Sequence, residues 1–149
     1  MVVIFVAKRM NKILIDTNII VYSKDSSSDF HQDSLRFVNS PGVELFTTSK
    51  NLSEYFAVVT KGIKPLLSPL EALQDIEEIV ARFEILYPSK LSLQKMIELV
   101  ANQQPTGLKI HDFEIISIAL ANGIYKICTL NKNDFKTISE VQIIGLTDI

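Results

Sequence analysis

The sequence predicts an α/β fold: a three-layer α/β/α sandwich whose central parallel sheet has four to five strands. Short apolar segments rich in β-branched residues alternate with longer segments in which apolar residues recur at helical spacing. Gly62 and Gly123 end two of the helical segments, and Pro41 and Pro88 mark further boundaries. Strands joined through helices need right-handed crossovers, so these strands form a parallel sheet covered on both faces.

The expected elements follow one another with short connections. Residues 12–16 (KILID) are typical of a buried strand because they are few, apolar and partly β-branched. Ser68, Pro69 and Glu71 form a complete helix start, with a capping serine, a proline at the first position and a glutamate that closes a capping box. The other expected strands are residues 43–47, 83–87, 125–130 and 141–146, and the expected helices are residues 31–40, 49–62, 69–82, 91–104 and 111–123.

Composition and charge restrict the class of protein. The chain has 149 residues, of which 47% are hydrophobic, which suits a single domain spanning 1–149 with one sizeable core. A formal net charge of -2 gives no strong overall field for a polyanion, so a nucleic-acid ligand would need local basic clusters or metal ions. The mean hydropathy of +0.23 is high for a free monomer and favours a covered apolar face.

Cysteine usage and the amino-terminal segment bear on the compartment. Cys128 is the only cysteine, so no internal disulfide and no cysteine-based zinc site can form, and the chain suits a reducing cytoplasm. The apolar run at residues 2–7 is too short to span a membrane, and its basic pair follows it, which is the wrong order for a signal peptide. Met10 offers an alternative start, and residues 1–9 have two interpretations, an extension or an extra edge strand.

Polar side chains follow two of the predicted strands at the point where each ends. Asp16, Thr17 and Asn18 come directly after the first strand, and Thr129 and Asn131 end the fourth. Ligands of open parallel sheets bind beyond the carboxyl ends of the strands. The first three residues can start a helix, hold a metal or position a phosphate, and a strand end suits each of these roles.

Three further acids are candidates for the same edge, and each also has an ordinary structural interpretation. Asp112 lies on the apolar stripe of its helix, where a carboxylate is costly unless it is paired, capped or metal-bound, although it would also complement the helix dipole. Asp134, taken alone, is a loop or cap residue. Glu54 falls opposite the apolar stripe of its helix, so periodicity alone predicts a solvent-exposed acid. That stripe consists of Leu52, Tyr55, Phe56 and Val59.

Four sequence segments contain these acids. ILIDTNIIVY contains Asp16, and TTSKNLSEYFAVV contains Glu54. IHDFEIISIALANGI places Asp112 before a run of isoleucines and alanines that ends in glycine, and CTLNKNDF contains Asp134. With these four segments in this order, residues 12 to about 146 resemble the PIN-domain family, and within it the small VapC-like toxins of toxin–antitoxin modules.

The resemblance implies an activity, a cofactor and partners. It implies a Mg²⁺- or Mn²⁺-dependent endoribonuclease that acts on RNA, pairs with a cognate antitoxin protein and forms a homodimer. At Asn131 many relatives carry a further acid, so fewer carboxylates serve a second metal position here. The implied catalytic and metal-holding residues are Asp16, Glu54, Asp112 and Asp134, and the implied supporting residues are Thr17, Asn18, Thr129 and Asn131.

The chemistry of the candidate residues agrees with this role. Phosphodiester cleavage needs an activated water and a stabilised leaving oxygen, and clustered carboxylates supply both by holding hard cations. Without a cation the four acids repel one another, and at least one takes a raised pKa. Lysines near the candidate edge offer positive charge for an RNA backbone, in contacts that weaken as salt rises, although each is also explained as a solubilising residue. These are Lys61, Lys64, Lys109, Lys132 and Lys136.

Two other classes of protein remain open at this point. A non-catalytic RNA- or protein-binding module on the same fold would use the acids as helix caps, but none of the four motif acids is missing. A phosphoryl-transfer domain of the receiver or phosphatase type also has an acid after its first strand. Here no second acid lies beside or two residues after Asp16, and residues 83–90 (FEILYPSK) offer no phosphoacceptor aspartate. The segment before Ser68 (KGIKPLL) is a candidate clip or groove-lining element.

Overall fold

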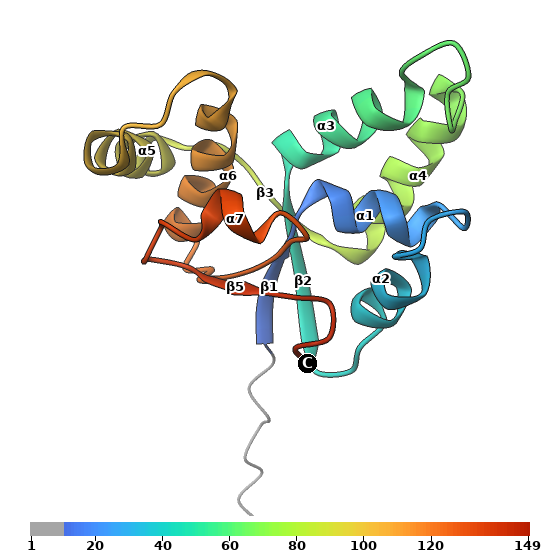
Figure 1. Ribbon diagram of the computed structural model, residues 1–149, viewed down its shortest axis with the longest axis horizontal. Helices are drawn as coiled ribbons and strands as arrows, with labels where there is room; N and C mark the ends of the chain where they lie inside the picture. Colours follow the sequence, from blue (N-terminus) through green and yellow to red (C-terminus); the bar gives the residue numbers. More distant parts are fainter. Residues whose placement is uncertain (1–10) are drawn as a thin grey trace, which may run out of the picture.

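The computed structural model describes residues 11–149 and contains one sheet with helices on both sides (Figure 1). All five strands are parallel, and their order across the sheet is β3-β2-β1-β4-β5. The predicted three-layer sandwich is therefore confirmed. The predictions for residues 1–9 and for a start at Met10 lie outside the described residues. The strands are β1 (Asn11–Ile15), β2 (Val43–Thr48), β3 (Glu84–Leu86), β4 (Lys126–Cys128) and β5 (Gln142–Ile144).

Side chains of β1 alternate between the two faces of the sheet and contribute to a core on each side. Ile13 and Ile15 are buried under helices α1 to α4, whereas Leu14 is buried under α5, α6 and α7 (Figure 1). Within residues 11–149, no helix combines the length and apolarity that crossing a membrane requires. The helices are α1 (Thr17–Lys24), α2 (His31–Val38), α3 (Ser49–Thr60), α4 (Pro69–Arg82), α5 (Lys90–Gln103), η1 (Gly107–Lys109, a 3-10 turn), α6 (Ile110–Ala121) and α7 (Lys132–Phe135).

Every strand and helix predicted from the sequence has an observed counterpart, although several observed elements are shorter. The expected strand at 125–130 ends at Cys128, so Thr129 already belongs to the turn that follows β4. The predicted start of α4 is confirmed, because the Ser68 hydroxyl accepts from the Glu71 N–H and the Glu71 carboxylate accepts from the Ser68 N–H.

Three short helical segments, α1, η1 and α7, were not among the expected elements, although a helix start at residues 16–18 was one of the open interpretations. The α1 sequence TNIIVYSK is rich in β-branched residues, which taken locally favour a strand. In the fold, its Ile19 and Ile20 are buried in the core, and Asp16 caps its first turn. Tertiary burial and the cap therefore outweigh the local propensity, and the chain turns directly from strand to helix.

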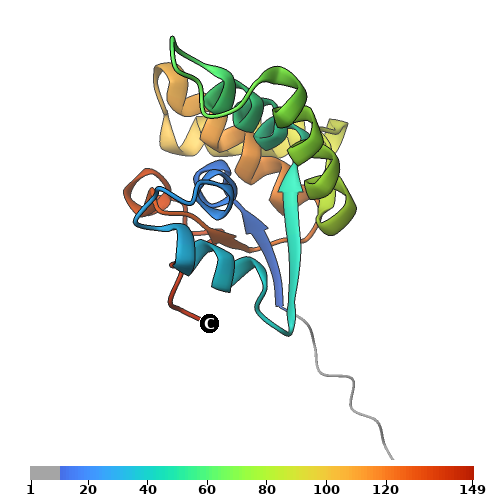
Figure 2. The same cartoon turned by 90° about the vertical axis from the view of Figure 1, so that its right-hand side faces the viewer.

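The fold brings the carboxyl ends of β1, β2 and β4 to the same edge of the sheet. The arrows of β1 and β2 point toward this edge in Figure 2, with α3 lying beyond it. Helix α1 begins one residue after β1, and α3 follows β2 directly, so both helices start there. Residues 16–18 and 129–131 therefore lie on this edge, as their positions after the strands predict.

Candidate active site

Asp16 is held rigidly at the junction of β1 and α1. One carboxylate oxygen accepts from the Thr17 N–H at 2.8 Å, and the other accepts from the Thr129 hydroxyl at 2.7 Å. Burial raises the pKa of Asp16, the two hydrogen bonds counteract that rise, and the charges of Glu54 and Asp134 add to it. The helix-cap interpretation of Asp16 is confirmed, and the same carboxylate also lines a cleft.

Thr17 and Asn51 connect the start of α1 to the start of α3. The Thr17 hydroxyl donates to Glu54 Oε2 at 2.7 Å and accepts from the Asn51 amide at 3.0 Å. The same amide nitrogen lies 3.4 Å from Asp16 Oδ1, and the Asn51 side chain is fully buried. Asn51 also closes the capping box of α3 with Thr48. Sequence reasoning missed Asn51, although its spacing from Thr48 is the capping signal that would have identified it.

Glu54 lies in the cleft rather than in open solvent, which corrects the expectation from helix periodicity. Tyr55 and Val59 pack into the core from one flank of α3, while Glu54 on another flank reaches Thr17. The periodicity argument also placed Phe56 on the packed stripe, but 37% of that residue is exposed. The stripe of α3 is therefore narrower than predicted, because the first turns of the helix overhang the edge of the sheet.

Asp112 lies in the first turn of α6, on the opposite side of the cleft from α3. Its pKa is raised to about 6, first because the carboxyl is partly buried and then because Asp16, Asp134 and Glu54 are nearby, while Lys109 has the opposite effect. Its side chain forms no hydrogen bond with any other residue of 11–149. Asp112 is thus the least satisfied carboxylate of the group.

Thr129 organises the other supporting residues. Its hydroxyl oxygen accepts from the Asn131 N–H at 3.0 Å and lies 3.4 Å from the Asn18 amide. Asn18 and Asn131 both line the cleft. Asp134 is exposed in α7 and does not line the cleft, but its charge raises the pKa of Asp16 and Asp112.

The cleft has a volume of about 590 Å³. Its polar residues offer mainly carboxylate, hydroxyl and amide oxygens, the donors that Mg²⁺ and Mn²⁺ prefer. In the described part of the chain, no three Asp, Glu, His or Cys side chains gather closely enough to hold a metal ion. Burial is the first cause of the raised pKa of both Asp16 and Asp112, and neighbouring carboxylates add to each rise, so negative charge is concentrated here that a divalent cation would relieve. The donor chemistry therefore fits a hard cation.

Comparison with known proteins identifies the family. The family model described as the PIN domain matches residues 13–141, which is most of the chain. The chain belongs to the PIN-domain family. Among curated proteins, none matches the sequence of this PIN domain.

Solved structures share the fold of this PIN domain at low sequence identity. VapBC2 from Rickettsia felis, bound to a DNA fragment from its promoter, is 22% identical with a TM-score of 0.69 and covers 90% of this chain and 98% of that one. FitAcB from Neisseria gonorrhoeae is 15% identical with a TM-score of 0.70 over 92% and 99%. VapC20 from Mycobacterium tuberculosis, a sarcin-ricin-loop-cleaving toxin, is 12% identical with a TM-score of 0.66 over 85% and 95%.

The predicted RNA-contacting lysines occupy different positions around this PIN domain. Lys109 is near enough to Asp112 to lower its pKa, so it is the lysine most directly associated with the acids. Lys132 lies 3.9 Å from Asp148, which partly neutralises its charge. Lys61 and Lys64 are exposed in the segment between α3 and α4. Leu66 of that segment lines the cleft, as the groove-lining interpretation of KGIKPLL predicts.

Proposed function

We propose that this PIN domain is a divalent-metal-dependent endoribonuclease and the toxin of a toxin–antitoxin pair. The observation that carries the proposal is the convergence of Asp16, Glu54 and Asp112 on one cleft at the carboxyl edge of a parallel sheet. Three carboxylates in one cleft lower the stability of the fold, and the raised pKa values of Asp16 and Asp112 express that cost. A cost of this kind at a cleft indicates a functional site.

The residues divide the work between holding a cation and orienting its ligands. Asp16, Glu54 and Asp112 hold Mg²⁺ or Mn²⁺, and Asp134 adds negative charge from α7. A bound cation supplies an activated water and neutralises charge on the leaving oxygen. Thr129 fixes one oxygen of Asp16, and Thr17 fixes Glu54, so neither carboxylate has to be ordered when RNA binds.

The amides and lysines serve the RNA. Asn18 and Asn131 line the cleft and offer N–H donors to phosphate oxygens. Lys109, beside Asp112, is placed to contact the backbone on the acidic side of the cleft, and Lys61 and Lys64 extend positive charge along the segment after α3. The proposed site thus combines negative charge that attracts the cation with positive charge that attracts the RNA backbone.

The similar structures support the partners in this proposal. A similar structure from Klebsiella pneumoniae is a toxin–antitoxin complex, and VapC20 of Mycobacterium tuberculosis is named as a toxin that cleaves the sarcin-ricin loop. By analogy, the partners here are an RNA substrate, a cognate antitoxin and a second copy of the chain, in the cytoplasm. The analogy is one of fold, and the acids of the cleft supply the chemical argument.

A non-catalytic binding module on the same fold is the competing function. One observation favours this binding module. Within residues 11–149, no three Asp, Glu, His or Cys side chains lie close enough together to hold a metal ion. In such a module Asp16 caps α1, Glu54 accepts from Thr17, and neither acts on a substrate. The two functions differ in whether cleavage occurs and whether it needs a cation.

The deciding experiment measures cleavage of bulk RNA with and without Mn²⁺ or Mg²⁺. The wild type should cleave only with the cation, and Asp16→Asn should reduce the rate at least about a hundredfold while keeping an oxygen that caps α1. Asp33→Asn is the matched control, because Asp33 is a partly exposed acid on α2 that does not line the cleft. Cation-independent binding of RNA without cleavage would support the binding module instead.

A further inference from the structure

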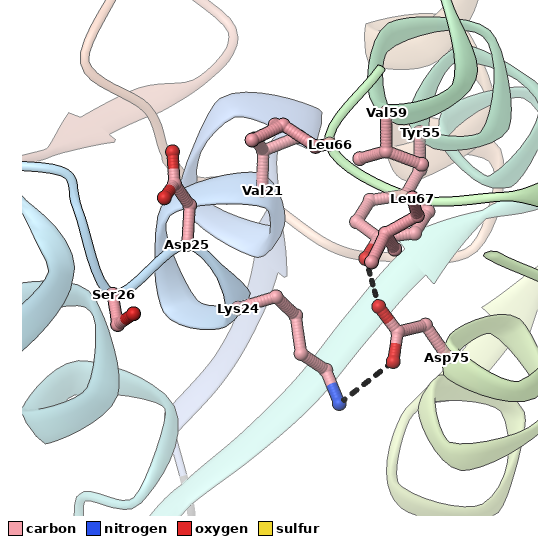
Figure 3. Close-up of a pocket in the computed structure, with 9 residues that line it drawn as sticks. All are labelled: Val21, Lys24, Asp25, Ser26, Tyr55, Val59, Leu66, Leu67 and Asp75. Carbon is pink, nitrogen blue, oxygen red and sulfur yellow. Dashed lines mark hydrogen bonds and ion pairs between the residues drawn. The ribbon is translucent and has the colours of Figure 1, made fainter. Parts of the chain in front are cut away.

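A second hollow adjoins the acidic cleft, and the two share part of their walls. The hollow has a volume of about 310 Å³, within the range of small-ligand sites, and lies between α1, α3 and α4 (Figure 3). Val21, Asp25 and Leu66 line both the hollow and the cleft, so the hollow adjoins the cleft at the Asp25 end of α1.

The far wall of the hollow is a closed polar network. The Tyr55 hydroxyl donates to Asp75, and Lys24 lies 3.7 Å from the other oxygen of Asp75 and also pairs with Glu78. These contacts link α1, α3 and α4, and Figure 3 shows Tyr55, Asp75 and Lys24 joined in one chain. Because these polar groups already bond to one another, this wall shapes the hollow but offers no free group to recognise a ligand.

Asp25 differs from that network because part of its carboxylate is free. Its Oδ1 accepts from the backbone N–H and the hydroxyl of Ser27 at 3.0 and 2.6 Å, which orients the side chain. These hydrogen bonds hold the pKa of Asp25 below its usual value, so the group is ionised at neutral pH. Its Oδ2 accepts no hydrogen bond from any other residue of the described chain, and Figure 3 shows the carboxylate apart from Lys24 and Asp75.

Apolar side chains of the shared rim and an aromatic side chain of the cleft surround Asp25. Tyr22 lines the cleft next to Asp25, and its ring packs against that of Phe30 with centroids 5.3 Å apart. Val21 and Leu66 complete the rim, and 54% of Leu66 is exposed. Unpaired RNA bases are bound in this kind of environment, stacked on aromatic or apolar side chains while a polar group meets their hydrogen-bonding edge.

Resting on the proposed ribonuclease function, we infer that the rim around Asp25 is a nucleobase subsite that selects guanine in the single-stranded substrate. Asp25 and Asp16 stand at opposite ends of α1, roughly 14 Å apart along the helix axis at 1.5 Å per residue. The base that Asp25 contacts therefore belongs to a nucleotide that flanks the scissile bond held near Asp16.

The preference for guanine follows from the acceptor-only chemistry of an ionised carboxylate. On its Watson–Crick edge guanine presents two adjacent donors, the ring N–H and the exocyclic amino group. Adenine and cytosine set a ring-nitrogen acceptor next to their amino group, and uracil flanks its N–H with two carbonyls. Those acceptors would face the negative charge of Asp25 and be repelled, so guanine alone fits without an opposing contact.

The test compares wild type, Asp25→Asn and Asp29→Asn on single-stranded oligomers that vary in one base at each position. Asp29 is an exposed acid of the same loop and lines neither the hollow nor the cleft, so Asp29→Asn is the matched control. Asparagine at 25 retains the oxygen that Ser27 contacts, and unchanged thermal unfolding checks that the loop is intact. At one fixed position from the cut, the wild type and Asp29→Asn should favour guanine about tenfold in kcat/KM, and Asp25→Asn should lose this preference.

A binding arm separates this inference from the proposed activity. Fluorescein-labelled oligomers with guanine, inosine or adenine at that position are titrated into Asp112→Asn protein, with and without the Asp25→Asn change. If no cleavage was detected, each oligomer position is scanned in turn. Inosine lacks the amino donor, so its affinity should fall between those of guanine and adenine.

Cleavage without base preference, or a guanine preference that survives Asp25→Asn, overturns the subsite and leaves the proposed nuclease activity intact. No cleavage with guanine-selective binding that depends on Asp25 overturns the nuclease alone, and the absence of both cleavage and selectivity overturns both.

Discussion

The hydroxyl groups of two threonines determine how the acids of the cleft are held. Thr129 donates to Asp16, and Thr17 donates to Glu54, so each carboxylate keeps one fixed oxygen. Asp112 has no such donor among residues 11–149, and it is the acid whose pKa is raised to about 6. The group therefore contains two oriented carboxylates and one that no hydrogen-bond donor of the described residues compensates.

Glu54 tests the proposed metal site most directly. Glu54→Gln keeps the size of the side chain and an oxygen that accepts from Thr17, but it removes the charge. We expect weaker dependence on Mg²⁺ concentration and slower cleavage, with a loss in the free energy of unfolding of less than about 1 kcal/mol. Rates across a Mg²⁺ titration, together with urea unfolding, measure both effects. Unaltered cleavage would reduce the proposed metal-holding residues to Asp16 and Asp112, with Asp134 adding negative charge.

Asp112 should make the stability of the metal-free protein depend on pH. Its pKa rises from 3.8 to about 6 on folding, so the folded chain binds more protons between these values. The stability contributed by the protonated carboxyl is therefore present below the lower value and is lost as the pH rises through about 6. At pH 7, Asp112→Asn should be more stable than the wild type by at most about 1 kcal/mol, because solvent screens the partly exposed carboxyl.

The measurement for Asp112 is urea unfolding in chelator at a series of pH values. The two proteins should be equally stable near pH 4 and diverge as the pH rises, and added Mg²⁺ should stabilise the wild type alone. If Asp112→Asn is instead unfolded or strongly destabilised at every pH, the role of Asp112 is to stabilise the first turn of α6.

The sequence places some of these residues well and others poorly. Asp16 and Asp112 are recognisable because a carboxylate beside an apolar strand or on an apolar stripe needs an explanation, and both line the cleft. Glu54 could be located there only through the family resemblance, because helix periodicity indicated solvent. Asn51 was missed because its contacts to Thr17 and Asp16 depend on how α1 and α3 meet, which no local pattern reports.

Among the secondary-structure elements, α1 shows why local patterns fail. Its β-branched residues favour a strand, but β1 ends at Ile15 and the next residue, Asp16, is already the N-cap of α1. Turning into a helix buries Ile19 and Ile20 and lets Asp16 cap the first turn. The longer helices α4, α5 and α6 were predictable because their periodicity persists over several turns.

The junction of α1 and α3 depends on Asn51, which gives a prediction for both helices. Asn51→Ala removes the capping contact with Thr48 and the donor shared by Thr17 and Asp16. We expect a loss of about 2 kcal/mol in the free energy of unfolding, from one lost cap and one unpaired buried group. Asn102→Ala, an exposed change on α5, is the control and should cost much less. Equal unfolding midpoints for the two variants would mean that Asn51 does not join the helices.

At the scale of the whole molecule, large apolar side chains remain outside both cores. Several of them lie on α4, on α5 and in the turn before α6. Burying such residues removes apolar surface from water, which favours association. They include Leu70, Leu73, Val80, Leu93, Ile97 and Leu108, which are between 48% and 82% exposed.

We expect a homodimer from this distribution and from the pairing that the family resemblance implies. Light scattering at micromolar concentration should therefore give a mass twice the 16.8 kDa of one chain. The association is driven mainly by apolar burial, so raising the salt concentration should leave the mass unchanged, whereas contacts between surface charges would weaken. A dilution series separates a stable dimer from transient contact. A monomer mass throughout the series would contradict the dimer and leave these apolar side chains for the antitoxin to cover.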